Sequence, residues 1–358
     1  MSRDARVNLL IGTGHFLSHF YVLAMPPLFI AWQRSFDVSF AQLGMTVALM
    51  SGVTALLQTP VGFLVDKHGA RPFLVGGTLL MTLAMAAMGF ATAFWQILLL
   101  AMLSGIGNSV IHPADYAILT GSVNKARMGQ SFALHTFAGN LGFAVAPPAM
   151  AALSLALGWR GSLLLVGGIG LPLVGTILLQ SRVLVDQART PQADHGGPAL
   201  SGRQLLMTRP MLLFFGFFML SSMAGAGVQS WLITVLHQVN GLGVEAASSA
   251  LTGYMAGATG GVLIGGWIAD RIKRHLTFAT VLTVISAALV LAVGVLPWLP
   301  DALIVAMMFA AGLTLGASRT PRDVMVKDAA PPGQIGKVFG FISAGLPLGS
   351  AVTPVPFG

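Results

Sequence analysis

The chain has 358 residues, of which only 8% are charged and 55% are hydrophobic, and it contains no cysteine. An average soluble protein carries about 25% charged residues. The composition therefore excludes an ordinary soluble enzyme and a disordered chain, and the lack of cysteine excludes a disulfide scaffold. The net charge of +8 raises the question of nucleic-acid binding, which the positions of the charges must decide.

Apolar segments long enough to cross a hydrocarbon core of about 30 Å recur along the whole chain. They predict an all-α polytopic membrane protein, since only helices and closed barrels satisfy the backbone inside lipid. The first segment lacks a small-residue cleavage site, so a signal peptide is the weaker interpretation. We expect eleven spans, at about 7–31, 41–65, 73–92, 94–120, 130–157, 161–180, 210–236, 247–269, 276–296, 301–320 and 335–358.

The connections between these segments alternate in charge. One set carries 17 of the 19 cationic residues, from Arg3 to Lys337, and the other set carries only Arg34 and Arg160. The excess of cations on cytoplasmic loops then predicts a cytoplasmic N-terminus in a bacterial-type inner membrane. Topology thus explains the basic charge, and we expect no nucleic-acid partner. An aromatic belt is predicted at the external ends, from Trp32, Trp95, Trp159 and Trp298.

The two halves of the chain repeat each other. A polar connection at 181–209 separates a predicted six-helix bundle, 1–180, from a bundle of five spans, 210–358. Gly62 to Lys67 matches Gly266 to Arg271 at an offset near 200 residues, and the pair Pro113 and Asp115 matches Pro321 and Asp323. Such parallel repeats are typical of transporters built from two related bundles.

At these residues the chain resembles the major facilitator superfamily. The segment Gly62-Phe63-Leu64-Val65-Asp66-Lys67-His68-Gly69-Ala70-Arg71 is similar to the family's loop signature and departs from it at Ala70. The segments Gly105 to Pro113 and Gly139 to Pro147 resemble the fosmidomycin-resistance-type efflux proteins of that family. The resemblance implies two helical bundles that work by alternating access on a small organic solute. It also implies twelve spans, so the sequence is expected to lack the last helix.

Polar residues within the spans are the candidates for binding substrate or protons, because such groups are costly in lipid. His15 and His19 share one face of the first helix, as Asn108 and His112 do on the fourth, and the resemblance implies that both helices line the central cavity. Asn140 and Gln229 complete the set. The alternative is that these groups only hold the bundle together by hydrogen bonds. A zinc site at His15 and His19 is not expected, since no carboxylate or H-E-x-x-H pattern accompanies them.

A second group of residues is predicted to form a cytoplasmic gate or latch between the halves. Asp115 is expected at the cytoplasmic end of the fourth span, where Lys67 or Arg71 could pair with it. Asp66 suits the positive N-terminal end of the eleventh span. The internal repeat extends the group to its counterparts, giving Gly62, Asp66, Lys67, Gly69, Arg71, Asp115, Asp270, Arg271 and Asp323.

These features predict a monomeric secondary transporter without cofactor or metal, which exports a small organic solute in exchange for protons carried by His19 or His112. Two alternatives stay open: facilitated or proton-symport uptake of a small organic acid, and a truncated remnant that does not transport. An intramembrane enzyme is not expected, because no convergent pair of carboxylates or nucleophile with a base is evident.

Overall fold

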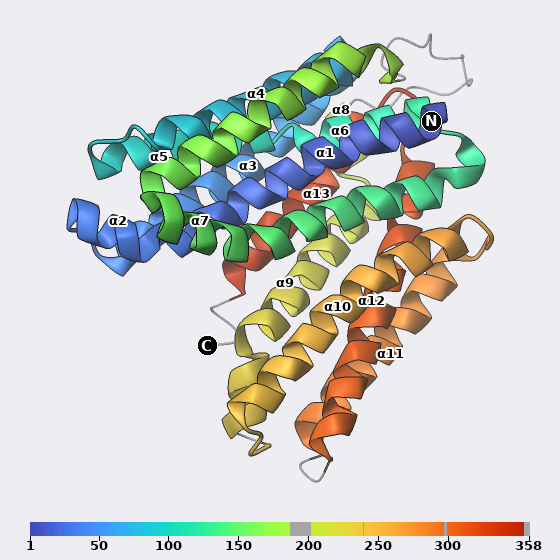
Figure 1. Ribbon diagram of the computed structural model, residues 1–358. Coiled ribbons are helices and arrows are strands. Elements are labelled where there is room, and N and C mark those ends of the chain that lie inside the picture. Colours follow the sequence, from blue (N-terminus) through green and yellow to red (C-terminus); the bar gives the residue numbers. More distant parts are fainter. Residues whose placement is uncertain (187–201, 239, 297–298, 354–358) are drawn as a thin grey trace. The chain divides into compact units, whose positions relative to one another are not determined.

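The computed structural model describes residues 1–186, 202–238, 240–296 and 299–353. Within these ranges the chain is helical and has no strand, as the composition predicts. Trp298, Pro354 and most of the polar connection (187–201) lie outside the described residues. The main helices (Figure 1) are α1 (Arg3–Ala24), α2 (Phe29–Phe36), α3 (Phe40–His68), α4 (Ala70–Met88), α5 (Phe94–Asn108), α6 (Ile111–Ser122), α7 (Met128–Gln180), α8 (Gly202–Leu206), α9 (Arg209–Gln238), α10 (Val244–Ala269), α11 (His275–Val295), α12 (Asp301–Ala329) and α13 (Ile335–Val352).

Nine segments of the described chain are long and apolar enough to cross a membrane. One of them, Lys125–Val183, has 59 residues and is interrupted at Gly158, whose φ of 70° is left-handed. That break divides α7 near the point where the sequence predicts a boundary between two spans. The glycine-rich α10 has 26 residues and is not among the nine. The predicted count of six plus five spans stays a prediction.

Two predicted spans contain breaks that the hydropathy pattern does not reveal. The span predicted at 94–120 consists of α5 and α6, with Ser109 and Val110 between them. The first span bends at a 3₁₀ turn, Pro26–Leu28, because two successive prolines remove backbone donors. Helix α4, which corresponds to the third predicted span, begins at Ala70, three residues before the predicted start of that span. Gly69 ends α3 with a φ of 91°, and the Asp186 carboxylate accepts a hydrogen bond from the Ala70 backbone N–H at 2.6 Å.

The chain forms two compact units, and neither is continuous in sequence. Unit 1 contains residues 1–123, 138–218 and 330–348, and unit 2 contains 124–137, 219–329 and the end of the chain from 349. Unit 1 therefore includes most of α13, which belongs to the second sequence half, and unit 2 includes the first turns of α7, which belong to the first half. The division at 181–209 stays a prediction about the sequence halves.

The aromatic belt predicted from tryptophan is only partly present among the described residues. Trp95 is 60% exposed, as an interfacial anchor requires. Trp32 is fully buried and Trp159 is 7% exposed; their rings pack edge to face with centroids 6.2 Å apart. Trp159 also donates a hydrogen bond from Nε1 to Ser35 Oγ at 3.0 Å. These two residues therefore close the end of unit 1 by packing and do not face lipid.

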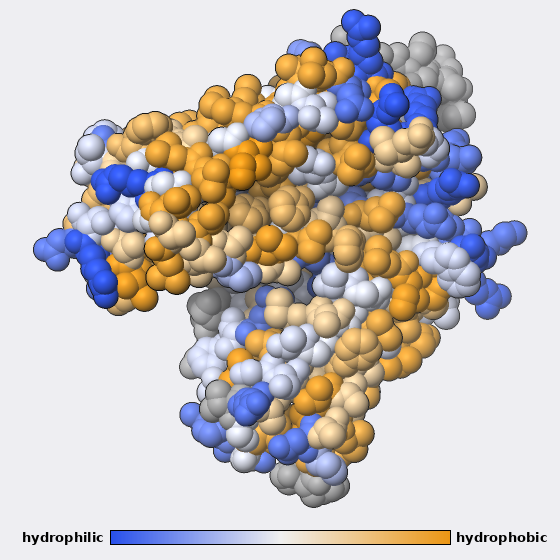
Figure 2. Space-filling model, viewed as in Figure 1, coloured by the Kyte–Doolittle hydropathy of each residue, from blue (hydrophilic) through white to orange (hydrophobic). Residues whose placement is uncertain are grey.

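Exposed side chains on the middle of the helices are largely hydrophobic. In the view of Figure 2, hydrophilic residues gather towards helix ends and hydrophobic ones cover the lengths between. This is the reverse of a soluble surface, since lipid tails solvate leucine and valine as well as a protein core does. Such exposed residues occur in both units and include Leu79, Leu83, Leu99, Ile169, Leu179, Val281, Val284 and Leu291.

In unit 2, glycines bring α10 and α12 into close contact. Gly253, Gly257, Gly261 and Gly265 recur every fourth residue on α10 and therefore lie along one face. A Cβ at Gly257 would meet the carbonyl of Phe309, and one at Gly261 the carbonyl of Leu313. On α12, Gly312 and Gly316 approach the backbone of α10 in the same way. Small residues spaced by four allow two membrane helices to approach at backbone distance.

Candidate functional site

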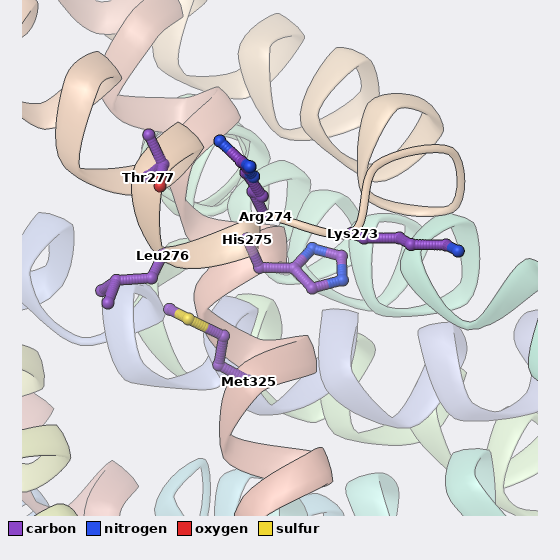
Figure 3. Close-up of a pocket in the computed structure, with 6 residues that line it drawn as sticks. All are labelled: Lys273, Arg274, His275, Leu276, Thr277 and Met325. Carbon is purple, nitrogen blue, oxygen red and sulfur yellow. The ribbon is translucent and has the colours of Figure 1, made fainter.

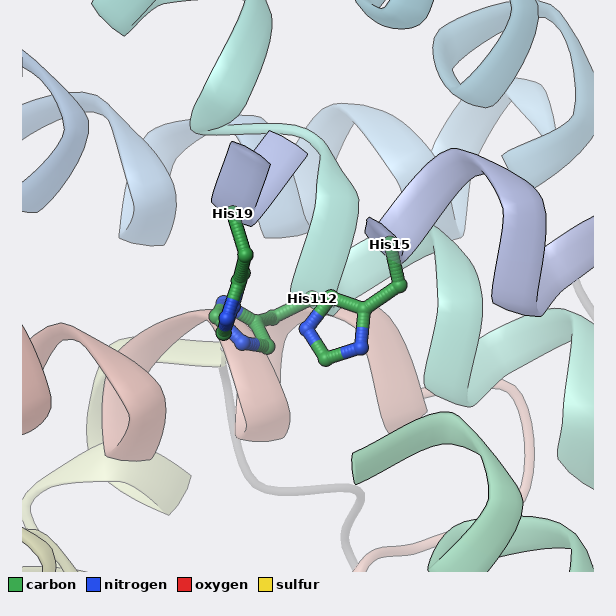
Figure 4. Close-up of side chains that lie close together, drawn as sticks. All are labelled: His15, His19 and His112. Carbon is green, nitrogen blue, oxygen red and sulfur yellow. The ribbon is translucent and has the colours of Figure 1, made fainter. Parts of the chain in front are cut away.

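Three imidazoles from two distant segments meet in unit 1. His15 and His19 lie one turn apart on α1, and their ring centroids are 4.3 Å apart. His112 on α6 brings its ring centroid to 5.4 Å from that of His15 and 6.3 Å from that of His19 (Figure 4). His15 is 3% exposed, whereas His19 and His112 are half-buried. The faces that the sequence analysis derives from helical spacing do meet within this unit.

Two polar side chains of α3 extend this cluster. Gln58 is fully buried, and its Nε2 lies 3.1 Å from Nδ1 of His112. One turn earlier on α3, Thr54 Oγ1 accepts a hydrogen bond from Asn108 Nδ2 at 3.3 Å and donates one to the Gly105 carbonyl at 3.1 Å. Thr54 and Gln58 of α3 thereby contact polar groups on both sides of the α5–α6 break, Asn108 at the end of α5 and His112 on α6.

Glycines on α7 leave the space that the imidazoles occupy. A Cβ at Gly139 would lie 2.7 Å from Cε1 of His15 and 2.9 Å from Nδ1 of His19. A Cβ at Gly142 would meet the carbonyl of Phe16 and approach Cβ of His19 at 3.2 Å. The next residue, Phe143, stacks on His19 with ring centroids 4.1 Å apart. The lack of a side chain at these two glycines therefore makes room for the two histidine rings.

Two of the predicted candidates are not part of this cluster. Asn140 is half-buried on α7 and makes no hydrogen bond within the described part of the chain. Gln229 is exposed on the part of α9 that belongs to unit 2. They are predicted as polar residues within spans, and that criterion carries no information on which side chains meet.

Asp66 lies at the N-terminus of α13. Its two carboxylate oxygens accept hydrogen bonds from the backbone N–H groups of Gly336, at 2.7 Å, and Lys337, at 3.0 Å. The Lys337 ammonium is 3.7 Å from the same carboxylate. A Cβ at Gly62 would meet the Gly336 carbonyl, so the absence of a side chain there permits the two helix ends to touch. A carboxylate at this position satisfies otherwise unpaired N–H groups and complements the helix dipole.

Asp270 repeats this arrangement in unit 2. Its carboxylate accepts hydrogen bonds from the N–H groups of Gly129, at 2.6 Å, and Gln130, at 3.0 Å, at the start of α7. Gly129 and Gly266 approach each other there as Gly336 and Gly62 do in unit 1. The two sequence halves therefore share this hydrogen-bond arrangement as well as the sequence motif. In each case the aspartate caps a helix from the other sequence half.

Other residues of the predicted latch have different surroundings. Asp115 is fully buried, whereas Lys67 and Arg71 are exposed. The pairing expected for Asp115 stays a prediction. Arg271 donates a hydrogen bond to the carbonyl of Trp267 and stacks on its ring at 4.0 Å. Gly69 supplies the left-handed residue that ends α3.

Two arginines and one aspartate form a buried charged group on α12. Arg322 is 7% exposed, and its Nε and Nη2 are each 2.9 Å from Oδ1 of Asp323, which is 1% exposed. Arg319 is half-buried one turn earlier and lies within electrostatic range of Arg322, Asp323 and Tyr254. Two guanidinium groups and one carboxylate therefore lie close together in a poorly solvated part of α12. The predicted span ended at 320 and left Arg322 in a loop.

A separate surface hollow of unit 2 is basic. It is lined by residues at the start of α11 and by one residue of α12, with Lys273 and Arg274 exposed (Figure 3). His275 and Met325 are also among the residues that line it. Its cations belong to one of the loops that the charge pattern places on the cytoplasmic side. We assign it no solute, because its polar groups are those of an open, hydrated loop.

The comparisons with known proteins agree with the helical architecture. The sequence model of the Major Facilitator Superfamily matches residues 11–354. The chain belongs to the Major Facilitator Superfamily. Members of this superfamily are membrane transporters and not enzymes. The resemblance carried by Gly62 to Arg71 is thereby confirmed at the level of the family.

Two relatives from Escherichia coli (strain K12) show how far the similarity extends. The fosmidomycin resistance protein is 26% identical over 342 residues, which cover 92% of this chain and 80% of that protein. The probable L-galactonate transporter is 26% identical over 255 residues, 68% of this chain, and the match spans just over half, 56%, of that relative. A solved structure of the E. coli fucose:proton symporter FucP covers 99% of this chain with a TM-score of 0.73 at 16% identity. It shows the superfamily fold.

Several residues of these sites escaped the sequence analysis. Gln58 and Thr54 are not among the predicted candidates, because nothing in a single sequence links α3 to α6. Asp186, in the polar connection, caps α4 from 116 residues away. Arg319 and Arg322 were counted as loop cations. The internal repeat could have indicated that these two arginines lie within a span. It aligns Pro321 and Asp323 with Pro113 and Asp115, which lie within a predicted span of the first half.

Proposed function

We propose that this member of the superfamily is a secondary transporter of a small organic anion, with its N-terminus in the cytoplasm. The observation that carries the proposal is the pair of arginines, Arg319 and Arg322, that lie one turn apart within the membrane-spanning helix α12. Arginine is costly inside a membrane-spanning helix, so its presence there marks a candidate site for a solute. The planar guanidinium of arginine suits carboxylate, sulfonate and phosphonate groups in particular.

The names of the relatives fit an anionic solute. One is described as a probable L-galactonate transporter and another as a fosmidomycin resistance protein. A third, from Cupriavidus necator, is described as a probable sulfoacetate transporter and is 26% identical over 68% of this chain. Galactonate and sulfoacetate are organic anions, and their charged groups match the donor geometry of arginine.

Coupling to protons and outward transport are part of the proposal. The solved structure with the same fold is that of a fucose:proton symporter, and the relative that covers 92% of this chain is named for drug resistance. Either exchange or symport draws on the proton gradient, so both differ from facilitated diffusion in one respect: an uncoupler abolishes accumulation. The histidine cluster of unit 1 is the part of the chain where the sequence analysis expects the proton.

A ligand-stabilisation screen on the purified full-length protein tests the anion proposal. The solutes are sugar acids, sulfonates and phosphonates, each paired with a neutral sugar or alcohol of similar size. We expect at least one anion to raise the midpoint of thermal unfolding and its neutral partner to leave the midpoint unchanged. Binding to the native state alone raises stability in proportion to the logarithm of ligand concentration.

The variant Arg319→Gln identifies the site, and Arg274→Gln is its matched control, because Arg274 is exposed on a loop. We expect Arg319→Gln to weaken anion binding about ten- to hundred-fold, the usual cost of losing one charged hydrogen-bond partner. Arg274→Gln should bind as the unmodified protein does. Equal stabilisation of Arg319→Gln and the unmodified protein would contradict the proposed site, and stabilisation by neutral solutes alone would contradict the substrate class.

A further inference from the structure

We propose that His15, His19 and His112 form a binding site for a divalent transition-metal ion, with Zn²⁺ as the ion that fits best. Each residue offers one imidazole nitrogen, and the three nitrogens all lie within 4.8 Å of one another. Figure 4 shows the three rings converging from α1 and α6. This site goes beyond anion transport and does not depend on it.

The separations are close to those that a bound zinc ion imposes. Zinc–nitrogen bonds of about 2.0–2.1 Å in a tetrahedral site place the nitrogens about 3.3 Å apart. His15 and His19 extend from one face of α1, because residues four apart on a helix lie one above the other. Rotation of the side chains supplies the remaining ångström or so, without movement of either helix.

Gln58 is placed to orient the third ligand. A histidine that binds metal through one ring nitrogen donates the proton on its other nitrogen to a neighbouring acceptor. Gln58 lies 3.1 Å from Nδ1 of His112, and its Oε1 is buried without a hydrogen-bond partner. Rotation of the amide by half a turn presents that oxygen to Nδ1–H, which fixes the tautomer that leaves Nε2 for the metal ion.

The donor set selects the class of metal. Three imidazoles without a carboxylate suit Zn²⁺ and its neighbours Cu²⁺ and Ni²⁺, whereas Mg²⁺ and Ca²⁺ require oxygen ligands. Three protein ligands leave the fourth tetrahedral position open for water or for an anionic group. His19 and His112 are only half-buried, so an ion can reach the cluster along their exposed edges.

The sequence alone argued against zinc because no carboxylate accompanies His15 and His19. The structure replaces the missing carboxylate with a third imidazole, 93 positions beyond His19 in the chain. The space that Gly139 provides beside Cε1 of His15 and Nδ1 of His19 belongs to the same arrangement. A side chain at that position would displace both rings.

Metal titration of the full-length protein, stripped of metal and freed of any purification tag, tests the site. We expect one equivalent of Zn²⁺ to bind with a dissociation constant of about 1 µM or tighter, in competition with a chromophoric chelator. Co²⁺, used as a spectroscopic substitute, should give the intense visible absorption of a tetrahedral site. This spectrum needs no variant. Mg²⁺ should compete with neither ion.

Variants then assign the ligands. His19→Ala and His112→Ala should each weaken Zn²⁺ binding at least ten-fold, and Gln58→Leu about ten- to hundred-fold, the usual effect of losing the group that orients a ligand. Gln58→Glu keeps an acceptor at Nδ1 and should retain binding. His68→Ala, which removes an exposed imidazole at the end of α3, is the matched control and should bind as the unmodified protein does.

Three results would overturn the proposal. The first is Zn²⁺ binding weaker than about 100 µM in the unmodified protein, and the second is octahedral, weakly absorbing Co²⁺. The third is a set of histidine variants that elute as folded protein and bind within two-fold of the unmodified protein. A variant that does not fold is replaced by His19→Gln or His112→Gln, which keep the polarity and approximate size of the side chain.

Discussion

Single aspartates cap helices at two related places in this chain. Asp66 and Asp270 each accept two backbone hydrogen bonds, at 2.7 and 3.0 Å and at 2.6 and 3.0 Å. Loss of a capping carboxylate costs about 0.5–2 kcal/mol of stability. Because both contacts join segments from different sequence halves, we propose that they act as latches on the conformational change and not on solute binding.

We therefore expect the variants Asp66→Ala and Asp270→Ala to have the same two effects on transport. Each should lower the turnover number several-fold while the solute affinity stays within about two-fold, because neither residue belongs to the anion or histidine sites. Asp328→Ala is the control, since that carboxylate is exposed and pairs with its neighbour Lys327. Transport rate and affinity are measured separately. Loss confined to affinity, or an effect at one aspartate alone, would contradict the latch.

The residue scale also shows what a single sequence can predict about a site. The repeat identified Asp66 and Asp270 together, and the helix dipole argument gave the eleventh span as the partner of Asp66. The faces of His15, His19, Asn108 and His112 followed from helical spacing. Gln58 and Asp186 could not be found in this way, because each acts on a helix far away in sequence and helical periodicity contains no information on such pairs.

At the scale of elements, the close contact between α10 and α12 depends on glycine at a few positions. A Cβ at Gly261 would meet the carbonyl of Leu313 and lie 2.9 Å from the Ala317 nitrogen, whereas one at Gly260, the adjacent residue, meets nothing within 4 Å. We expect Gly261→Ala to destabilise the protein by about 1–3 kcal/mol, the usual cost of overpacking. Gly260→Ala should be neutral or stabilise by up to about 1 kcal/mol, since alanine favours the helix.

Thermal unfolding of the two variants in the same detergent measures this difference. Equal midpoints for Gly260→Ala and Gly261→Ala would show that α10 and α12 are not in backbone contact. The hydropathy pattern could not predict this contact. Averaged hydropathy gives Gly261 and Gly260 the same value. The glycine content of α10 also lowers its mean hydropathy, the quantity by which membrane spans are recognised.

Helix boundaries illustrate the same limit. Sequence periodicity and length predicted each of the long helices from α9 to α12 within a few residues at its start. The end of α12 was placed at 320 because Arg322 and Lys327 look like loop residues, yet the helix continues to Ala329. Arg322 remains helical and buried because Asp323 neutralises it, a compensation that composition does not reveal.

At the scale of the whole molecule, composition predicted the class of protein directly. A chain with 8% charged residues cannot form a soluble surface, and its few cations gather on alternate connections. The family match over residues 11–354 and the fold of a solved transporter agree with that interpretation. Substrate and coupling stay proposals, and they depend on a handful of buried polar groups in otherwise apolar helices.

Solute flux into and out of proteoliposomes, with purified protein and an imposed pH gradient, tests the central claim most directly. The solute is an organic anion that stabilises the protein, and its neutral counterpart is the control. The account predicts accumulation of the anion against its gradient without nucleotide, abolished by a protonophore and by Arg319→Gln. Flux that ignores the pH gradient and the protonophore, or equal flux of the neutral counterpart, would contradict it.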